Sequence, residues 1–330
     1  MKIAQLNAFG VPWEVVDCIE VADPGPPAEG EVQVEMLACP INPAELLIIE
    51  GKYASKPDLP ARLGIEGAGR VSALGPGVEG LAEGDLVMSL GRANWAQRLN
   101  LKAGETVKAP PGIDVAQLAM LKANPATAYL MLQSYVDLQP GDWVIQNAAN
   151  SGVGVNLIRL AGARGLKTVN VVRREALIQP LSDIGADVVA VDGEDLAERV
   201  ATATGGAPIK LAIDAVAGAA TERLADCLAE DGTVVNYGLL SGEACRLRAD
   251  QTIFKGITLT GFWLAKVMRQ SPFAELQAMY AELMARVAEG SLQVEVEASY
   301  GLEDVKAALE HAAREARGGK VLITPNGPIA

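Results

Sequence analysis

The residues that decide the fold are Trp143-Val-Ile-Gln-Asn-Ala-Ala-Asn-Ser-Gly-Val-Gly-Val-Asn-Leu-Ile-Arg-Leu-Ala161. They begin with apolar and β-branched residues, pass through Asn150-Ser-Gly-Val-Gly154 and continue with apolar residues at helical spacing, which predicts a strand, a tight turn and a helix. A glycine turn that opens a helix brings backbone N–H groups close to a pyrophosphate, and the helix N-terminus favours its negative charge. The stretch therefore predicts a dinucleotide cradle. The alternative is that the glycines only relieve crowding at a helix N-terminus.

A second buried strand, Gly165-Leu-Lys-Thr-Val-Asn-Val-Val172, is followed by Arg173 and Arg174. After this strand an NAD site carries an acidic residue for the ribose 2′-hydroxyl, whereas arginine accommodates the 2′-phosphate of NADP. The pair therefore predicts NADP(H) as the cofactor. The alternative is a solvated pair of charges at a strand end.

Length and composition indicate a globular α/β protein of two domains. The chain has 330 residues, half of them hydrophobic, with 34 glycines. A net charge of −13 without a basic stripe argues against a nucleic-acid partner. No run reaches the roughly 18 apolar residues of a membrane span. The first residues, Met1-Lys-Ile-Ala-Gln-Leu6, predict a strand and not a signal peptide, so we expect a cytoplasmic protein.

The number and spacing of the cysteines and the single histidine argue against a metal site. The four cysteines are scattered without paired spacing, which is typical of reduced thiols: Cys18, Cys39, Cys227 and Cys245. A zinc ion needs three or four converging ligands, and this chain has only His311 and no Cys-x-x-Cys motif. We therefore expect no metal. We interpret His311 as a surface or packing residue of a helix and not as a catalytic group.

The order of the predicted elements suggests two domains. Residues 1–122 alternate short apolar runs with glycine and proline, which predicts a compact, barrel-like β domain. A helical segment, residues 114–137, is interrupted at Asn124-Pro125 and leads into a second domain, residues 123–264. There strands alternate with helices, as in a parallel sheet covered on both faces. Residues 265–330 are expected to return to the first domain and make it discontinuous.

Approximate boundaries follow from the apolar pattern. For the parallel sheet we expect strands at residues 143–148, 167–172, 188–191, 210–214, 232–238 and 257–263, with helices around 175–185, 194–204 and up to 229. For the C-terminal part we expect a helix at 272–289, a strand at 293–298, a helix at 302–317 and a strand at 320–323.

Several motifs together resemble those of one enzyme superfamily. They are Asn42-Pro-Ala-Glu45, Gly51-Lys-Tyr53, Gly64-Ile-Glu-Gly67, Asn124-Pro-x-Thr-Ala128, Gln146-Asn-x-x-Asn-Ser-Gly-Val-Gly154 and Gly261-Phe-Trp-Leu264. In these motifs the chain is similar to the medium-chain dehydrogenases/reductases, and within them to the mitochondrial-type 2-enoyl thioester reductases. Much of the pattern is shared with NADPH:quinone oxidoreductases. The resemblance implies a doubly wound Rossmann domain and a discontinuous, GroES-like catalytic domain.

The resemblance also implies roles for single residues. It implies that Tyr53 is the proton donor, and that the zinc ligands Cys and His of the alcohol dehydrogenases are replaced by Asn42 and Ile65. After the second strand the family often has Arg-Asp-Arg, where this chain has Arg173-Arg174-Glu175. The implied NADPH contacts are Asn124, Asn150, Ser151, Gly152, Val153, Arg173, Arg174, Tyr237, Gly238, Leu239, Leu240, Phe262, Trp263, Leu264 and Lys320.

The residues alone leave several of these roles open. A phenol is protonated at neutral pH and qualifies as a proton donor to carbon, but Tyr53 in its Gly- and Pro-rich loop is equally well explained as an anchor. Phe262 and Trp263 either wall a substrate pocket or belong to a strand core. Lys320 either reaches the cofactor or is a surface charge. Asp214, at a strand end, either faces a ligand or caps the next helix.

The leading functional hypothesis is reduction by NADPH of the C=C bond of a trans-2-enoyl thioester, carried by CoA or by acyl-carrier protein, with hydride transfer to Cβ. The first alternative is an NADPH:quinone or enone oxidoreductase on the same scaffold. The second is an NADPH-binding protein without catalytic activity. The β-rich stretch from Gly256 to Trp263 is expected to form a sheet edge that pairs with a second copy, giving a homodimer.

Overall fold

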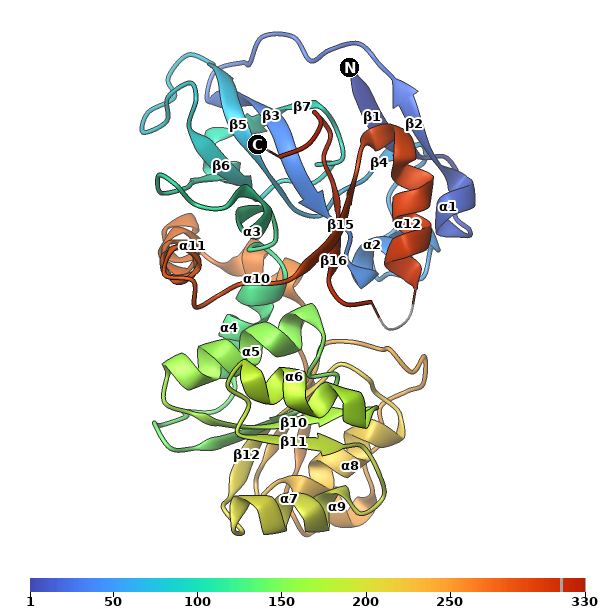
Figure 1. Ribbon diagram of the computed structural model, residues 1–330, viewed down its shortest axis with the longest axis vertical. Helices are drawn as coiled ribbons and strands as arrows, with labels where there is room; N and C mark the ends of the chain where they lie inside the picture. Colours follow the sequence, from blue (N-terminus) through green and yellow to red (C-terminus); the bar gives the residue numbers. More distant parts are fainter. Residues whose placement is uncertain (315–316, 330) are drawn as a thin grey trace. The chain divides into compact units, whose positions relative to one another are not determined.

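The computed structural model describes residues 1–314 and 317–329, so the end of the predicted helix at residues 302–317 lies partly outside the described residues. The chain divides into two compact units (Figure 1). The first unit contains Met1–Ala123 and Pro272–Ala330, and the second contains Asn124–Ser271. The first unit is thus built from both ends of the sequence.

The second unit is organised around a six-stranded parallel sheet. Its strands are β9 (Trp143–Gln146), β10 (Lys167–Val172), β11 (Val188–Val191), β12 (Ile209–Asp214), β13 (Thr233–Asn236) and β14 (Thr258–Gly261). The spatial order is β11-β10-β9-β12-β13-β14, and every neighbouring pair is parallel. The chain runs outward from β9 to β11 and then crosses to the other side of β9, so the strand order reverses between β9 and β12. This arrangement confirms the predicted doubly wound Rossmann sheet.

Helices cover both faces of this sheet (Figure 1). The helices of this unit are α4 (Asn124–Ser134), α5 (Gly152–Ala163), α6 (Ile178–Asp183), α7 (Leu196–Thr204), α8 (Ala219–Cys227), α9 (Ala249–Ile253) and α10 (Leu264–Gln270), with a short 3-10 turn at Glu175–Leu177. Successive strand residues point to opposite faces. Val172 packs with Ile158 of α5 and Leu181 of α6, whereas Val171 packs with residues of α7 and α8. The β-branched residues of the strands therefore supply two hydrophobic cores.

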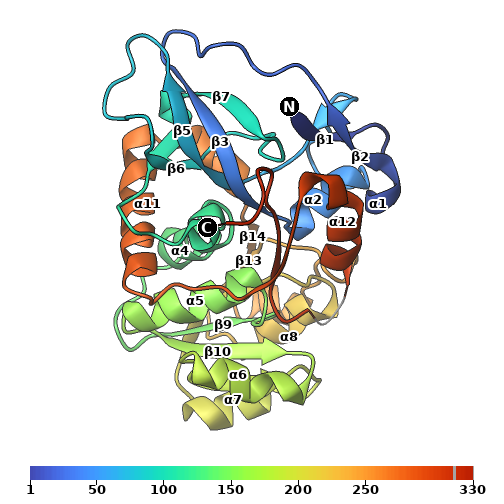
Figure 2. The same ribbon diagram turned by 45° about the horizontal axis from the view of Figure 1, so that its top comes forward.

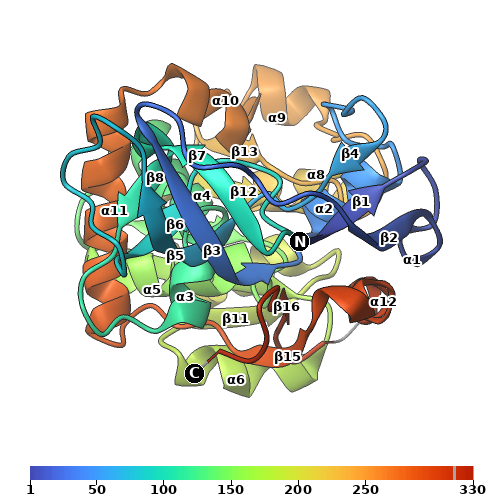
Figure 3. The same cartoon turned by 90° about the horizontal axis from the view of Figure 1, so that it is seen from above.

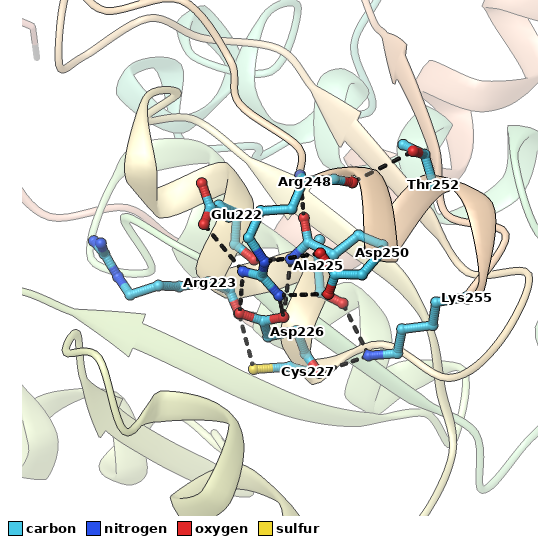
Figure 4. Close-up of polar contacts among 10 residues, drawn as sticks. Glu222, Arg223, Ala225, Asp226, Cys227, Arg248, Asp250, Thr252 and Lys255 are labelled. Atoms are coloured by element: carbon cyan, nitrogen blue, oxygen red, sulfur yellow. Dashed lines mark hydrogen bonds and ion pairs between the residues drawn. The ribbon is translucent and has the colours of Figure 1, made fainter.

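An ion-pair network around Arg248 joins α8 to α9 (Figure 4). Its guanidinium contacts Glu222 at 3.0 Å, Asp226 at 2.5 Å and Asp250 at 3.1 Å. The ammonium of Lys255 donates to the carbonyl of Asp226, near the end of α8, at 2.7 Å. The network fixes the segment that precedes β14.

The first unit contains two sheets. The larger has the order β15-β16-β3-β5-β6-β8, with β7 also paired to β3, and the smaller has the order β2-β1-β4. The strands are β1 (Lys2–Leu6), β2 (Val16–Glu20), β3 (Glu31–Pro40), β4 (Ala61–Arg62), β5 (Gly67–Leu74), β6 (Leu86–Ser89), β7 (Arg98–Lys102), β8 (Thr106–Lys108), β15 (Val296–Tyr300) and β16 (Lys320–Ile323). Within the described residues, the strand pairs of these sheets are antiparallel except β15 with β16, which is parallel. Figure 3 shows β3 with its neighbours β5 and β7. The sheets confirm the predicted GroES-like class.

Helices from both ends of the chain pack on these sheets. They are α1 (Pro12–Val15), α2 (Pro43–Ile49), α3 (Val115–Ala119), α11 (Phe273–Ala288) and α12 (Val305–Ala313), with 3-10 turns at Ala103–Glu105 and Leu302–Asp304. The C-terminal α12 lies beside α1 and β2 (Figure 2). Its apolar face, Val305, Ala308, Leu309 and Ala312, belongs to the same core as the first strands.

Several elements differ from the expected ones. Three strands of the parallel sheet were predicted to reach residues 148, 238 and 263, but they end at Gln146, Asn236 and Gly261 because the following residues turn into loops. The helix expected at residues 175–185 begins with a 3-10 turn, and the strand expected at 293–298 lies at 296–300. The helix α2 was not predicted, because its seven residues are too few to show a periodicity.

None of the helices in the described ranges is long and apolar enough to cross a membrane.

Candidate active site

The glycine turn after β9 leads directly into α5. Ser151 is the N-cap of this helix, and its hydroxyl accepts a hydrogen bond from the backbone N–H of Gly154 at 3.1 Å. A Cβ on Gly154 would lie 2.4 Å from the carbonyl oxygen of Ala149, so only glycine permits this close approach. Gly152 and Val153 supply the first amide groups of α5, which lack an acceptor within the helix. The turn therefore fits the pyrophosphate of a dinucleotide.

Asp214 fixes the loops at the point where the strand order reverses. It is completely buried at the end of β12. One carboxylate oxygen accepts from the side chain of Asn147 at 2.6 Å and from two backbone N–H groups of the following loop at 2.9 and 3.0 Å. The other accepts from Thr221 at 2.6 Å and from Asn236 at 3.1 Å. Because both oxygens are used by the protein, Asp214 shapes the site by holding three loops together.

The loop after β13 meets the glycine turn. The side chain of Tyr237 contacts that of Ser151, and burial raises the pKa of this phenol. A Cβ on Gly238 would lie 2.6 Å from the carbonyl oxygen of Ala215, so the loop is pressed against the end of β12. The next two side chains, Leu239 and Leu240, are 53 % and 60 % exposed. The structure thus brings two groups of predicted cofactor residues together.

The remaining predicted residues of the second unit occupy different environments. Arg173 and Arg174 are exposed and directly follow β10. The end of this strand is joined to the glycine turn, because the N–H of Ala149 donates to the carbonyl of Val171 at 3.3 Å. Phe262 is buried, and the half-buried ring of Trp263 stacks with a guanidinium group, that of Arg269, at 5.0 Å. Asn124 and Leu264 are half-buried first residues of α4 and α10, and Asn150 is exposed in the glycine turn.

Tyr53 belongs to the first unit and is held at the C-terminal end of α2. The backbone N–H groups of Lys52 and Tyr53 both donate to the carbonyl of Leu47, at 2.8 and 3.1 Å. Gly51 makes the connecting turn with φ +70°, a conformation that favours glycine. The ring of Tyr53 is half-buried against the core of this unit. The backbone of the loop is therefore fixed, and the role of the phenol as a proton donor stays a prediction.

Five buried polar residues form a cluster in the first unit, which we call the buried charge cluster: Asn42, Glu45, Glu66, Lys122 and Lys320. Their exposed fractions range from 0 % for Glu66 to 8 % for Lys320. The ammonium group of Lys320 donates to the side-chain oxygen of Asn42, whose amide nitrogen donates to Glu66 at 2.7 Å. The cluster therefore joins Lys320, a predicted cofactor residue, to the start of α2.

Backbone groups complete the buried charge cluster. The two oxygens of Glu45 accept from the N–H groups of Asn42 and Ile65, both at 2.9 Å. Lys122 donates to the carbonyl groups of Ile65 and Gly91, at 2.5 and 2.6 Å. Sequence reasoning quoted Glu45 and Glu66 only as parts of motifs and did not single out Lys122. One feature of the sequence could have pointed to the buried charge cluster: a charged residue lies between glycines in an apolar segment, as in Gly64-Ile-Glu-Gly67.

The low polarity around the buried charge cluster shifts the pKa values of its acidic and basic side chains. Burial raises the pKa of Glu45 to about 7 and also raises that of Glu66. Burial lowers the pKa of Lys122 to about 8 and lowers that of Lys320, against the effect of the neighbouring carboxylates. These directions are those expected when a charged form loses its hydration.

Two further findings concern the metal and histidine predictions. Within residues 1–314 and 317–329, no group of three or more His, Cys, Asp or Glu side chains could hold a metal ion. His311 lies on α12, where its ring nitrogens contact the hydroxyl of Tyr300 at 2.9 Å and a carboxylate oxygen of Glu297 at 3.0 Å. It connects α12 to β15.

Comparison with known proteins identifies both units. Residues 28–116 match the family model "Alcohol dehydrogenase GroES-like domain", and residues 152–287 match the model "Zinc-binding dehydrogenase". A protein of Dictyostelium discoideum named mitochondrial enoyl-[acyl-carrier-protein] reductase is 36 % identical over 301 residues, which are 89 % of this chain and 86 % of the relative.

Solved structures show the same relationship. Escherichia coli quinone oxidoreductase, crystallised with NADPH, is 30 % identical with a TM-score of 0.88, over 98 % of this chain and all of the other. The Candida tropicalis enoyl thioester reductase Etr1p, in complex with NADP and crotonyl-CoA, is 25 % identical with a TM-score of 0.85, over 98 % of this chain and 99 % of the other. The chain belongs to the medium-chain dehydrogenase/reductase superfamily of oxidoreductases and is related to both its enoyl thioester reductases and its quinone reductases.

Proposed function

We propose that this protein is an NADPH-dependent oxidoreductase acting on CH–CH groups, which reduces the C=C bond of a trans-2-enoyl thioester of CoA or acyl-carrier protein. The observation that carries the proposal is a phenol, Tyr53, on a loop with a fixed backbone, in a chain 36 % identical to a protein named enoyl-[acyl-carrier-protein] reductase. The relative Etr1p was crystallised with crotonyl-CoA, which is such a thioester.

The residues of the second unit fit NADP(H). The first amides of α5 offer N–H donors to the pyrophosphate, and the exposed Arg173 and Arg174 offer cations to the 2′-phosphate. The loop at Tyr237 and Gly238 borders the same turn. The proposed cofactor contacts of this unit are Asn124, Asn150, Ser151, Gly152, Val153, Arg173, Arg174, Tyr237, Gly238, Leu239, Leu240, Phe262, Trp263 and Leu264. In the first unit, Lys320 is proposed as a further contact.

The proposed chemistry divides the work between the cofactor and the protein. When bound, NADPH supplies a hydride to the β-carbon of the thioester. Tyr53 supplies the proton to the α-carbon, a task for which a phenol is in the right protonation state at neutral pH. The apolar ring of Phe262 and the half-buried ring of Trp263 help to exclude water.

The second candidate function is NADPH:quinone or enone reduction. It is favoured by the similarity to E. coli quinone oxidoreductase, which has a higher sequence identity than Etr1p. The experiment that separates the two is a steady-state comparison of crotonyl-CoA with a simple quinone, each with NADPH. Turnover of the quinone without reduction of the thioester would reject the leading proposal. Binding of NADPH without turnover of either substrate would instead indicate a protein that has lost catalysis.

We further propose that two copies associate along β14, the last strand of the parallel sheet. Three of its four residues are exposed, and Ile253 and Phe254, just before it in the chain, are 69 % and 81 % exposed. An unpaired strand edge beside exposed apolar side chains favours association. The C. tropicalis relative was crystallised as a heterodimer. Sedimentation equilibrium would show a homodimer for the native chain and a monomer for a double variant with lysine at Leu259 and Phe254.

The proposed location is cytoplasmic, as the composition and the reduced cysteines suggest. The D. discoideum relative is named a mitochondrial protein. Imaging of the tagged full chain in its own cells would decide between the two compartments.

A further inference from the structure

Lys320 is the first residue of β16, and its backbone is tightly held. Its N–H donates to the carbonyl of Glu295 at 2.8 Å. A Cβ on the preceding residue, Gly319, would lie 2.6 Å from that same carbonyl oxygen. The N–H groups of Gly318 and Gly319 both donate to a carboxylate oxygen of Glu297, at 2.7 and 3.0 Å. Because the backbone is fixed, the direction of the ammonium group depends on what holds the side chain.

The side chain is held by a chain of two residues. The ammonium of Lys320 donates to the side-chain oxygen of Asn42, and the amide nitrogen of Asn42 donates to Glu66 at 2.7 Å. The other oxygen of Glu66 accepts from the N–H of Ala123 at 2.8 Å. The orientation of the Asn42 amide is therefore fixed, because its oxygen must face the cation and its nitrogen the carboxylate.

We propose that Glu66 and Asn42 are positioning residues that keep the side chain of Lys320 charged and directed toward the nicotinamide cofactor. The proposal rests on the proposed function, in which Lys320 contacts NADPH. An ammonium carries three donors, and the contact with Asn42 uses one of them. Glu66 acts through Asn42 and does not itself touch the cofactor.

The reason for such an arrangement is the cost of burying a cation. Burial lowers the pKa of Lys320, and a neutral amine would lose its attraction for an anionic ligand. The groups that oppose this effect are the carboxylates of Glu66 and Glu45, while the guanidinium of Arg317 adds to it. Lys122 lies near Glu66 but donates to backbone carbonyl groups.

Glu66 is the better of the two carboxylates for a test. Both oxygens of Glu45 accept backbone N–H groups, one of them from the N-cap of α2, so its replacement would also disturb that helix. Glu66→Gln removes the charge and replaces the carboxylate by an amide of the same shape, which can accept from only one of the two donors, Asn42 and Ala123. Glu66→Asp keeps the charge and serves as the conservative variant.

The experiment is a titration of the full-length protein with NADPH, followed by its fluorescence, at a series of pH values from 7 to 10. In this range the 2′-phosphate is about 90 % ionised or more, since its second pKa is near 6. We expect the pH at which affinity is lost to fall by at least about one unit in Glu66→Gln, because one nearby charge shifts a pKa by that much. Glu66→Asp should restore part of the shift. Lys320→Met should bind roughly tenfold to hundredfold more weakly, with no dependence on pH in this range.

Two results would overturn the inference. One is a Glu66→Gln protein that loses affinity at the same pH as the native protein. The other is a loss by the same factor at every pH, which would show a structural role alone. If the native protein does not bind NADPH at any pH, the proposed function fails instead.

A second measurement does not depend on NADPH or on a folded Glu66 variant. In the native protein, the side-chain nitrogen resonance of Lys320 can be assigned by its loss in Lys320→Arg and followed with pH. We expect Lys320 to be charged at pH 7.5 and to lose its proton at a lower pH in Asn42→Ser. A neutral Lys320 at pH 7.5 in the native protein, or an unchanged titration in Asn42→Ser, would reject the role of the two positioning residues.

Discussion

The side chain of Tyr237 contacts that of Ser151, the N-cap of α5. The contact joins the loop after β13 to the glycine turn after β9, across the strand β12 that lies between them in the sheet. The hydroxyl of Ser151 also accepts the N–H of Gly154, so the residue that caps the helix start is in contact with the neighbouring loop. The amides proposed to bind the pyrophosphate are thus fixed before the cofactor arrives.

Replacing Ser151 by alanine removes both contacts. The loss of an N-cap lowers the free energy of unfolding by about 1 kcal/mol, and we expect the affinity for NADPH to fall as well. Tyr237→Phe should weaken the binding of NADPH and should destabilise α5 less than Ser151→Ala does. Urea denaturation and NADPH titration of both variants check this. An unchanged denaturation midpoint in Ser151→Ala would contradict the claim that Ser151 stabilises α5 as its N-cap.

Gly154 and Gly162 offer a matched pair on one helix. In Gly154→Ala the new methyl group would meet the carbonyl oxygen of Ala149 at 2.4 Å, so we expect loss of both stability and NADPH binding. A Cβ on Gly162 meets nothing within 4 Å, and alanine there should stabilise α5 by up to about 1 kcal/mol. Thermal denaturation with and without NADPH compares them. Equal behaviour of the two variants would mean that the turn does not need its glycine.

Tyr53→Phe tests the proton donor. We expect kcat with crotonyl-CoA to fall by about 100-fold or more, because a general acid contributes at least that much, while the Kd for NADPH stays nearly constant. Tyr300→Phe is the control, since this phenol contacts His311 of α12 in the same unit and should be dispensable for turnover. Stopped-flow measurement of NADPH oxidation gives both rates. Full activity of Tyr53→Phe would assign the proton to water or to another group.

Arg173→Gln tests the choice of cofactor. A charge-assisted contact contributes about 1.5 to 3 kcal/mol, so the Kd for NADPH should rise by roughly tenfold to more than a hundredfold, with little change for NADH. Arg174→Gln, at the neighbouring exposed position, shows whether the second arginine shares this role. Equal effects on the two nucleotides would show that Arg173 does not contact the 2′-phosphate.

The buried charge cluster predicts an unusual dependence of stability on pH. Glu45 has its pKa raised to about 7 in the folded protein, so its contribution is present below about pH 4.5 and is lost as the pH rises to 7. Lys122 has its pKa lowered to about 8, so its contribution is present above about pH 10.5 and is lost as the pH falls to 8. Together the two groups place a minimum of stability between about pH 7 and 8.

The slope that either group contributes is at most about 1.4 kcal/mol per pH unit. Urea denaturation from pH 5 to 10 measures this slope. In Glu45→Gln the decline of the free energy of unfolding between pH 5 and 7 should disappear, and its rise above pH 8 should be unchanged. If stability still declines between pH 5 and 7 in Glu45→Gln, a group other than Glu45 causes the decline.

The elements proposed to bind the nucleotide could be predicted from the sequence because their information is local. Strand, turn and helix at residues 143–161 follow one another, and Arg173 is placed by the end of the next strand. Tyr237 was named through the family resemblance, but its contact with Ser151 joins residues 86 positions apart, and no local pattern encodes it.

The buried charge cluster could not be predicted for the same reason. Lys320 and Asn42 are separated by 278 positions and meet only because β16 pairs with the end of β3. From the sequence alone Lys320 was as well explained by a surface charge, whereas the structure buries it. Burial of a charge depends on which distant strands pair, and hydrophobic periodicity carries no record of that pairing.

The split of the first unit between the two ends of the chain also sets an order of assembly on the ribosome. Residues 124–271 are continuous and leave the exit tunnel together, so they can fold while translation still proceeds. The strand β3 cannot pair with β16 until residues 320–323 have been translated. During that interval the part of β3 that pairs with β16 is an unpaired strand edge, which favours association with other chains.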